Sequence, residues 1–338
     1  MQVLKILCLY ILLLLMSSCN KKLELLDAGK KQIVLLGELT AGDSVYLRAG
    51  ESTAVKTGNT INEELIRDLT VAIDGAGGRF YLTGTEDDLS YSERTLAFSN
   101  ASQVQAGNTY TLDASHPSLG KATASIAIPA AFTVTVSDTA SADFLMKSCI
   151  QLHVTIDDLP EKNYYVLEVL QQPFTVEPAF LFNGQWFKQS EHWELYDSLF
   201  NAGMPPEERM DSFAIRMFTR IPSFSDDDKS EHLLNGKFSE PAKRILLDDK
   251  CFNGSRHAST LYIPKDALGM QYPGIGMFTI LQVKSVSADY FHYLKAYEQL
   301  GIFSGLPDNR SPVRVNGNVQ NGVGMVGGVF MREFRYIF

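Results

Sequence analysis

Cysteine is scarce in this chain, with four among 338 residues. Cys8 and Cys19 lie near the N-terminus, which leaves Cys149 and Cys251 in the rest of the sequence. So few thiols exclude a dense disulfide framework. Two alternatives stay open for the remaining pair: a disulfide between Cys149 and Cys251, or two separate thiols.

Motifs that carry chemistry are also missing. The six histidines are scattered, with no HExxH or HxH pattern, and there is no GxSxG nucleophile motif. The glycine-rich stretch 322–328 (GVGMVGG) precedes a β run, which favours a strand kink or tight turn over a phosphate-binding loop. The run 226–228 (DDD) favours a solvated acidic loop over a calcium site. We therefore expect no catalytic residue, no metal, no cofactor and no enzymatic activity.

An excess of positive charge is lacking as well. The formal net charge is -9, and removal of an N-terminal segment containing Lys5 would make it more negative. A surface of this sign repels phosphate backbones. Nucleic acid is therefore excluded as an expected partner.

Long hydrophobic runs are confined to the N-terminus. Lys5 precedes an unbroken apolar run over residues 6–16, which is followed by two serines and Cys19. A spanning helix needs roughly 20 apolar residues, whereas this layout is typical of a secretory signal. The residues before Cys19 resemble the bacterial lipobox, with Met16 in place of its usual leucine. The pattern predicts a signal peptide over 1–18 and a membrane anchor through lipid on Cys19; the alternatives are an ordinary secretory signal and an uncleaved anchor.

Short alternating runs with turn residues between them dominate the sequence that follows. After a tether at 19–31, residues 32–129 hold six or seven such runs, which predict an immunoglobulin-like β-sandwich. The segment 62–67 is the exception, and a helical turn or a bulging loop is expected there. Pro129 closes this unit and predicts a domain boundary near residue 130.

Residues 130–338 predict a second β-rich domain with one or two packed helices. Apolar side chains recur at helical spacing over 191–200, and again over 287–301 between a serine that suits an N-cap and a glycine that suits a stop. The region 171–237 between the strand runs is less regular and rich in proline. A segment of this kind often carries a binding surface.

Aromatic side chains gather within that irregular region. They are Phe180, Phe182, Trp186, Phe187 and Trp193. Large rigid rings are common at interfaces, so these residues are the candidate interaction surface. The alternative is that they fill a small core under the loop.

The C-terminal third resembles a known family. The segments 252–264 (FNGSRHASTLYIP), 281–300 (LQVKSVSADYFHYLKAYEQL) and 315–330 (VNGNVQNGVGMVGGVF) look like the closing segments of the Bacteroidetes lipoproteins grouped as domain of unknown function 4249. The lipobox and the strand that begins at residue 33 fit the same family.

That resemblance implies an N-terminal immunoglobulin-like or carboxypeptidase-regulatory-like β domain and a gene encoded near those of TonB-dependent outer-membrane receptors. It carries over no catalytic residue. The expectation is an outer-membrane lipoprotein that acts as an accessory interaction module in nutrient uptake, with the periplasmic and cell-surface faces both open. The alternatives are a structural or adhesive, fimbrillin-like surface protein and a glycan-active enzyme.

Overall fold

The computed structural model describes residues 31–52, 68–86, 96–215, 217–230, 241–269, 275–303 and 316–338. The predicted signal peptide, Cys19 and the segment 62–67 lie outside these ranges. Within them the chain is mainly β, as the alternating sequence predicts, and no helix is long and apolar enough to cross a membrane.

A first β-sandwich is built from the N-terminal strands and from one strand of the C-terminus. Its strands are β1 (Ile33–Thr40), β2 (Ser44–Glu51), β3 (Thr70–Gly75), β4 (Gly78–Glu86), β5 (Leu96–Gln103), β6 (Thr109–His116), β7 (Gly120–Ala127) and β18 (Val323–Tyr336). Every second side chain of β2 and β7 is buried, as expected for strands with one face on a core. β4 pairs with both β5 and β3, so the sheet folds over and encloses apolar side chains such as Leu35, Leu47 and Leu112. This arrangement agrees with the predicted β-sandwich.

A second group of strands follows. Its members are β8 (Thr133–Phe144), β9 (Lys147–Asp157), β10 (Tyr164–Phe182), β13 (Thr219–Ile221), β14 (Phe224–Ser225), β15 (Ile245–Asp248), β16 (Arg256–Pro264) and β17 (Ile275–Val286), with the short 3-10 helices η1 (Asp249–Cys251) and η2 (Lys265–Ala267). The sheet of β14, β16, β9 and β8 packs over β10, β15 and β17. Between these layers lies a second core that includes Leu152, Tyr165 and Leu281.

The strand β18 belongs to both groups. Its first half pairs in parallel with β1, from Val34↔Val323 to Thr40↔Val329. Its second half pairs antiparallel with β17, from Val286↔Val329 to Thr279↔Tyr336. The predicted boundary near residue 130 falls between β7 and β8, yet β18 continues the large sheet from one group into the other.

The glycine-rich stretch 322–328 covers the first part of β18 and the residue before it. The backbones of Leu35 and Ala127 come unusually close to it. Gly324 has a φ of +122°, and a Cβ on it would lie 1.9 Å from the carbonyl oxygen of Leu35. A Cβ on Gly328 would lie 2.0 Å from the carbonyl oxygen of Ala127. Only glycine permits this contact with β1 and with the end of β7.

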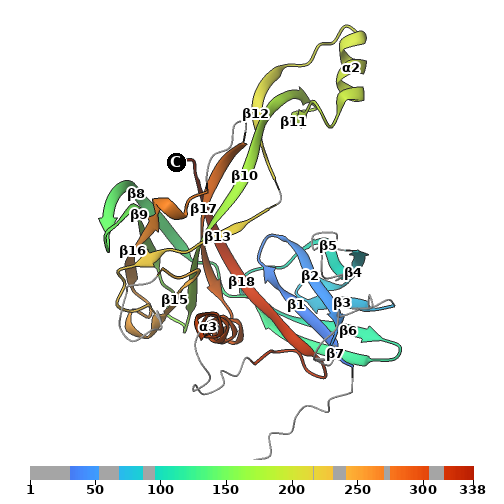
Figure 1. The fold of residues 1–338 in the computed structure, drawn as a ribbon. Helices are drawn as coiled ribbons and strands as arrows, with labels where there is room; N and C mark the ends of the chain where they lie inside the picture. Colours follow the sequence, from blue (N-terminus) through green and yellow to red (C-terminus); the bar gives the residue numbers. More distant parts are fainter. Residues whose placement is uncertain are drawn as a thin grey trace, which may run out of the picture.

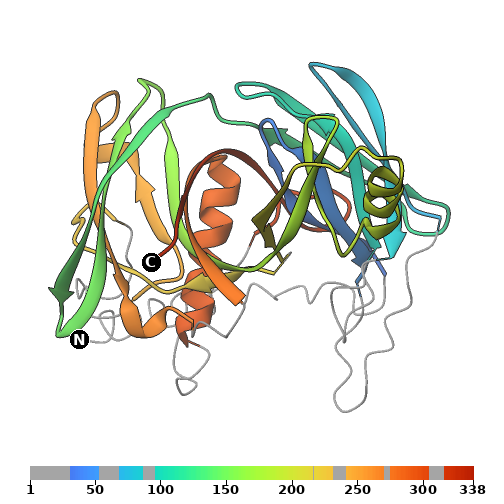
Figure 2. The same cartoon turned by 90° about the horizontal axis from the view of Figure 1, so that it is seen from above.

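Two helices are described, and both were predicted. They are α2 (Trp193–Asn201) and α3 (Ala288–Phe303). α3 lies between the two groups of strands (Figures 1 and 2) and buries Phe291 and Leu294 against Val166, Met325 and neighbouring apolar side chains. The expected stop at Gly301 is wrong, because the helix continues to Phe303.

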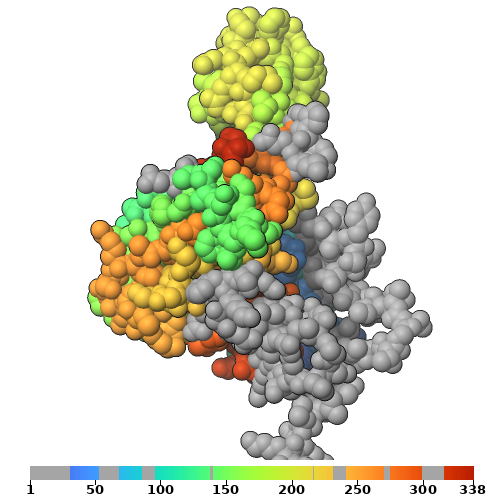
Figure 3. All heavy atoms as spheres, turned by 60° about the vertical axis from the view of Figure 1, so that its left-hand side comes forward, coloured from blue at the N-terminus to red at the C-terminus, as the bar shows by residue number. Residues whose placement is uncertain are grey.

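An arm projects from the body and carries α2 at its tip (Figures 1 and 3). β10 pairs with β17 as far as Thr175↔Ile275, and beyond that point it leaves the body. There it pairs on one side with β11 (Gln185–Lys188) and on the other with β12 (Glu208–Ala214). We call residues 174–214 the arm.

The arm leaves the body at the end of β18 opposite to the start of β1. Val34 pairs with Val323 at the beginning of β18, whereas Tyr336 at its end pairs with Thr279, next to the base of the arm. Fourteen residues of strand span roughly 45 Å at ~3.3 Å each. The first strand therefore begins far from the arm (Figure 1).

Candidate functional site

The arm is the candidate functional site, and a tight turn joins its strands β10 and β11. Phe182 pairs with Gln185, which leaves Asn183 and Gly184 as a two-residue loop with φ values of 50° and 77°. Asn-Gly with positive φ at both positions is the favoured sequence for such a hairpin. The chain then forms α2 and returns as β12, so that α2 lies beside a three-stranded ribbon (Figure 1).

A small aromatic core holds the arm together. Phe180 is fully buried, with its ring centroid 5.9 Å from that of Phe187 and 5.4 Å from that of Tyr196 on α2. Phe182 lies 6.4 Å from Phe187 on the neighbouring strand. These contacts fix α2 on the ribbon, because aromatic pairs at this spacing are favourable beyond the apolar area they bury.

The structure divides the five aromatic residues of the predicted interaction surface. Phe180 is a core residue of the arm, which corrects its place in that surface. Phe182, Trp186 and Phe187 are half-buried, and the guanidinium of Arg209 lies 3.8 Å from the centroid of the Trp186 ring. Trp193 is exposed, with 58% of its surface accessible. Some of these rings thus fill a small core of the arm, whereas for the solvent-facing Trp193 a role in an interaction surface stays a prediction.

Further apolar side chains of the arm are exposed. Their spacing in the sequence did not predict this exposure. Phe200 at the end of α2 is 58% exposed, and Met204 and Met210 are more than 60% exposed. Near the base, Met217 and Phe218 are also more than half exposed. Apolar side chains that gather in numbers on an exposed element can mark an interaction site.

The arm is acidic. Residues 174–214 contain seven carboxylates against two basic side chains, a net charge of -5. The ammonium of Lys188 lies 2.8 Å from Glu177 and 3.2 Å from Glu191, and Arg209 lies 2.6 Å from Asp211. The hydrogen bond from Lys188 lowers the pKa of Glu177 to about 2. Both basic side chains are thus paired within the arm, so its outward field is negative.

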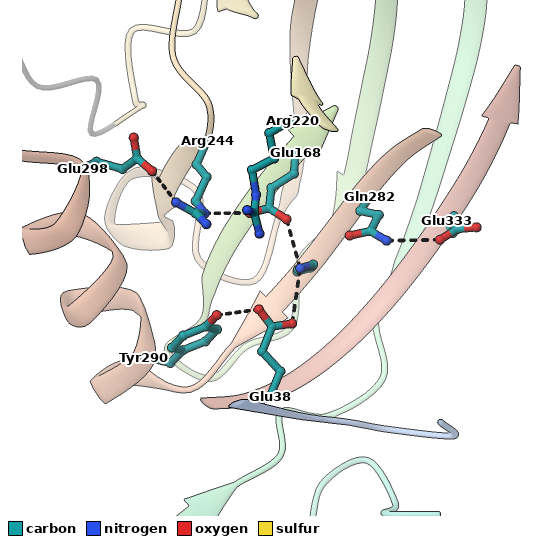
Figure 4. A network of polar contacts seen from close by, with 9 residues as sticks. Glu38, Glu168, Arg220, Arg244, Gln282, Tyr290, Glu298 and Glu333 are labelled. Atoms are coloured by element: carbon teal, nitrogen blue, oxygen red, sulfur yellow. Dashed lines mark hydrogen bonds and ion pairs between the residues drawn. The ribbon is translucent and has the colours of Figure 1, made fainter. Parts of the chain in front are cut away.

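A buried ionic network in the body is the largest cluster of charged groups among the described residues (Figure 4). Glu168 on β10 is 2% exposed. One of its oxygens lies 2.6 Å from Arg244 Nε and 3.2 Å from Arg220 Nε, and the other lies 3.0 Å from Lys284 Nζ. Lys284 also reaches Glu38 on β1 at 3.3 Å.

Two groups on α3 complete this network. Tyr290 donates a hydrogen bond to Glu38, and Arg244 pairs with Glu298 (Figure 4). Three carboxylates thus balance three cations. The network ties the first sandwich, the second sandwich and α3 together through Glu38, Glu168 and Glu298.

Burial and neighbouring charges shift the pKa values of Glu168 and Lys284 in opposite directions. Burial alone would raise the pKa of Glu168, but the charges of Lys284, Arg220 and Arg244 outweigh it and lower that pKa to about 2. Burial would lower the pKa of Lys284, and Glu38 and Glu168 reverse this effect and raise it. Glu168 is thus held ionised by its three cationic partners, so it is not poised to exchange a proton near neutral pH. The network is suited to a structural role.

The aspartate run 226–228 differs from the expected solvated loop at its middle residue, since Asp226 and Asp228 are exposed. Asp227 is buried, and its carboxylate lies 2.6 Å from Nε2 of the buried His257. The ring of Phe252 stacks on His257 at 4.1 Å. Asp226 accepts a hydrogen bond from the hydroxyl of Tyr262. Within the described part of the chain, no group of three or more His, Cys, Asp or Glu side chains is arranged to hold a metal ion.

Both cysteines of the body are free thiols. Cys149 is buried at the start of β9, where its thiol donates to the backbone carbonyl of Lys147 at 3.4 Å. Cys251 is exposed at the end of η1. This favours the alternative of two separate thiols over a disulfide between Cys149 and Cys251. Burial raises the pKa of the Cys149 thiol, which makes it unreactive.

Comparison with known proteins identifies a family. A family model described as a domain of unknown function, DUF4249, matches residues 22–334. No curated protein matches the chain.

Proposed function

The chain belongs to the DUF4249 family, and from this premise we propose that it is a cell-envelope lipoprotein that serves as an accessory interaction module beside a TonB-dependent outer-membrane receptor in nutrient uptake. The single observation that carries the proposal is the arm, an element that projects from two packed sandwiches and exposes aromatic and methionine side chains. An element that contributes little to the cores of the body is suited to contact another molecule.

The N-terminal sequence supports the envelope location. A charged residue, a short apolar run and small residues lead to Cys19, whose lipid would hold the protein to the outer membrane. Because β1 begins at the end of β18 opposite to the arm, a lipid at Cys19 would leave the arm directed away from its own attachment point. Such an arrangement suits contact with the part of a receptor that stands clear of the bilayer.

Attachment is tested by Cys19→Ala and cell fractionation. The variant should leave the membrane fraction, whereas the parent protein should stay in it and carry a lipid-modified mature N-terminus by mass spectrometry. A Cys19→Ala protein that remains in the membrane fraction would remove the lipid anchor from the proposal.

The role of the arm is tested by shortening it without touching the body. Val176 pairs with Ser212, so residues 177–211 can be replaced by Asn-Gly, which closes a two-residue hairpin at that register. The pairing of β10 with β17 up to Thr175 is retained. The TonB-dependent receptor encoded beside this chain, here called the neighbouring receptor, should no longer co-purify with the variant from native membranes. Retained co-purification with a folded variant would contradict the proposal, and filaments of the purified parent protein would favour the adhesive alternative.

A further inference from the structure

The tip of the arm presents a row of aromatic side chains along α2. Trp193, Tyr196 and Phe200 stand at positions i, i+3 and i+7, with ring centroids 6.1 Å and 6.4 Å apart along the row. Tyr196 rests on Phe180 in the ribbon, whereas Trp193 and Phe200 are each 58% exposed. No side chain of α2 is fully buried. This spacing is the one by which a helix anchors itself in an apolar groove.

Negative charge flanks this row. Glu194 and Asp197 lie on α2 itself and are exposed, and Glu207 is exposed where the chain enters β12. The two basic side chains of the arm are already paired with Glu177, Glu191 and Asp211, so the arm keeps its net charge of -5. A complementary surface must therefore be positive around an apolar centre, because like charges that meet across an interface cost several kcal/mol.

The same charge argues against a lipid surface as the occupant. Helices that lie on membranes carry lysine and arginine on their polar face, which attract anionic headgroups. α2 has no basic residue in its last turn and holds carboxylates instead. Aromatic anchors with an acidic border match a protein groove better than a bilayer.

We propose that α2 docks as a helix into an apolar groove of a partner protein, with Trp193 and Phe200 as its anchors and lysine or arginine side chains of the partner facing Glu194 and Asp197. This inference rests on the proposed function, since it specifies what the arm binds. Anchors of this kind hold most of the binding energy, and the charges at the border set the rate of association and its dependence on salt.

Intrinsic fluorescence gives a direct measurement, because both tryptophans of the chain, Trp186 and Trp193, lie in the arm. In a Trp186→Phe variant, Trp193 is the only reporter. Titration with the detergent-solubilised neighbouring receptor, itself freed of tryptophan signal by tryptophan analogue labelling, should shift the emission of Trp193 to shorter wavelength and protect it from iodide. Phosphatidylglycerol and phosphatidylcholine vesicles should leave the emission unchanged.

Two sets of variants separate anchors from charges. Trp193→Ala with Phe200→Ala should weaken binding at least about 30-fold, the effect expected for hot-spot anchors. Glu194→Lys with Asp197→Lys should slow association about 10-fold at low salt, with the difference vanishing at high salt. The matched control, Glu161→Lys with Asp228→Lys, makes the same charge change at exposed positions of the body and should leave association unchanged.

The outcomes distinguish this inference from the proposed function. If shortening the arm abolishes the complex but the Glu194 and Asp197 variant binds like the control, the arm is a docking element and the basic groove is wrong. If the shortened arm leaves the complex intact, both are wrong. A blue shift with vesicles alone would show that α2 binds a membrane rather than a protein groove. Circular dichroism of each variant confirms that α2 and the body stay folded.

Discussion

At the scale of single residues, the turn between β8 and β9 places two unfavourable side chains in a strained position. Phe144 pairs with Lys147, which leaves Leu145 and Met146 as a two-residue loop with φ values of 48° and 63°. Both are exposed, Met146 completely. Left-handed backbone costs an ordinary L residue roughly 1–2 kcal/mol.

Leu145→Asn with Met146→Gly should therefore stabilise the protein. Asn-Gly is the favoured sequence for this turn, so the free energy of unfolding in urea should rise by about 1–2 kcal/mol. Met146→Ala is the matched control, because it removes an exposed apolar side chain but keeps the unfavourable φ. An equal gain in the control would show that backbone conformation is not the cause.

Glu168 gives the protein a dependence on pH with a defined sign. Its pKa is depressed from an ordinary 4.5 to about 2 in the folded state, so it stabilises the fold above pH 4.5 and loses this contribution as the pH falls towards 2. The shift corresponds to about 3 kcal/mol near neutral pH. Glu168→Gln should lower the free energy of unfolding by that amount at neutral pH, and the loss should shrink as the solution is acidified.

Glu333→Gln is the control for this experiment. Glu333 lies on β18 and accepts a hydrogen bond from Gln282 (Figure 4). It also contacts Arg335 near the surface, where a carboxylate is worth less than about 1 kcal/mol. A loss at Glu168→Gln that is constant between neutral and acidic pH would contradict the role of its ionised form.

The sequence contains a partial signal for these residues. Glu168 and Lys284 interrupt otherwise apolar strand runs, and a charge in such a run is buried with a partner. The partner itself is not readable, because Glu38 and Lys284 are 246 positions apart. The exposure of Trp193 and the burial of Phe180 could not be distinguished either, since both depend on how the arm folds back on itself.

At the scale of elements, the arm should behave as a separate unit of stability. Its core is small and centres on Phe180, and beyond Thr175 β10 no longer pairs with β17. Phe180→Ala removes a buried ring, a change that typically costs about 3–5 kcal/mol. Hydrogen exchange should rise over 176–213 while β17 keeps its protection.

Trp193→Ala provides the comparison for that experiment. It also replaces a large aromatic side chain, but one that is exposed, so exchange in the arm should stay near that of the parent. A rise in exchange across β17 after Phe180→Ala would mean that the arm and the body unfold together.

Most individual elements were predictable, α2 included, whereas the strand pairing that builds the arm was not. Strands such as β1, β8 and β16 follow runs whose apolar and polar residues alternate or whose β-branched content is high, and α2 and α3 follow helical spacing. The second half of β10 and its partner β12 come from a segment marked by prolines. These strands form because residues such as Val176 and Ser212, 36 positions apart, pair with each other. No local sequence pattern predicts that pairing.

At the scale of the whole molecule, the topology depends on contacts between the two ends of the chain. Pro129 lies between β7 and β8, but nothing nearby indicates that β18 returns to β1 from more than 280 positions away. The glycines of 322–328 were the available signal. On sequence alone they predict a strand kink or tight turn. The structure shows that glycine is needed there because Leu35, Tyr290 and Ala127 approach the strand closely.

Because β18 lies in both sandwiches, damage to it should destabilise both at once. Gly324→Ala places a Cβ against the backbone of Leu35 and forces an L residue to a φ of +122°, so the β1–β18 pairing must shift. β18 continues into its pairing with β17, and the network of Glu38, Lys284 and Glu168 spans the same junction. Hydrogen exchange should therefore rise in β6 and β7 of the first sandwich and in β9 and β16 of the second.

Gly50→Ala, where a Cβ meets open space, is the control and should leave both sandwiches protected. Faster exchange confined to the first sandwich would show that the halves fold independently and that β18 joins them without coupling their stabilities.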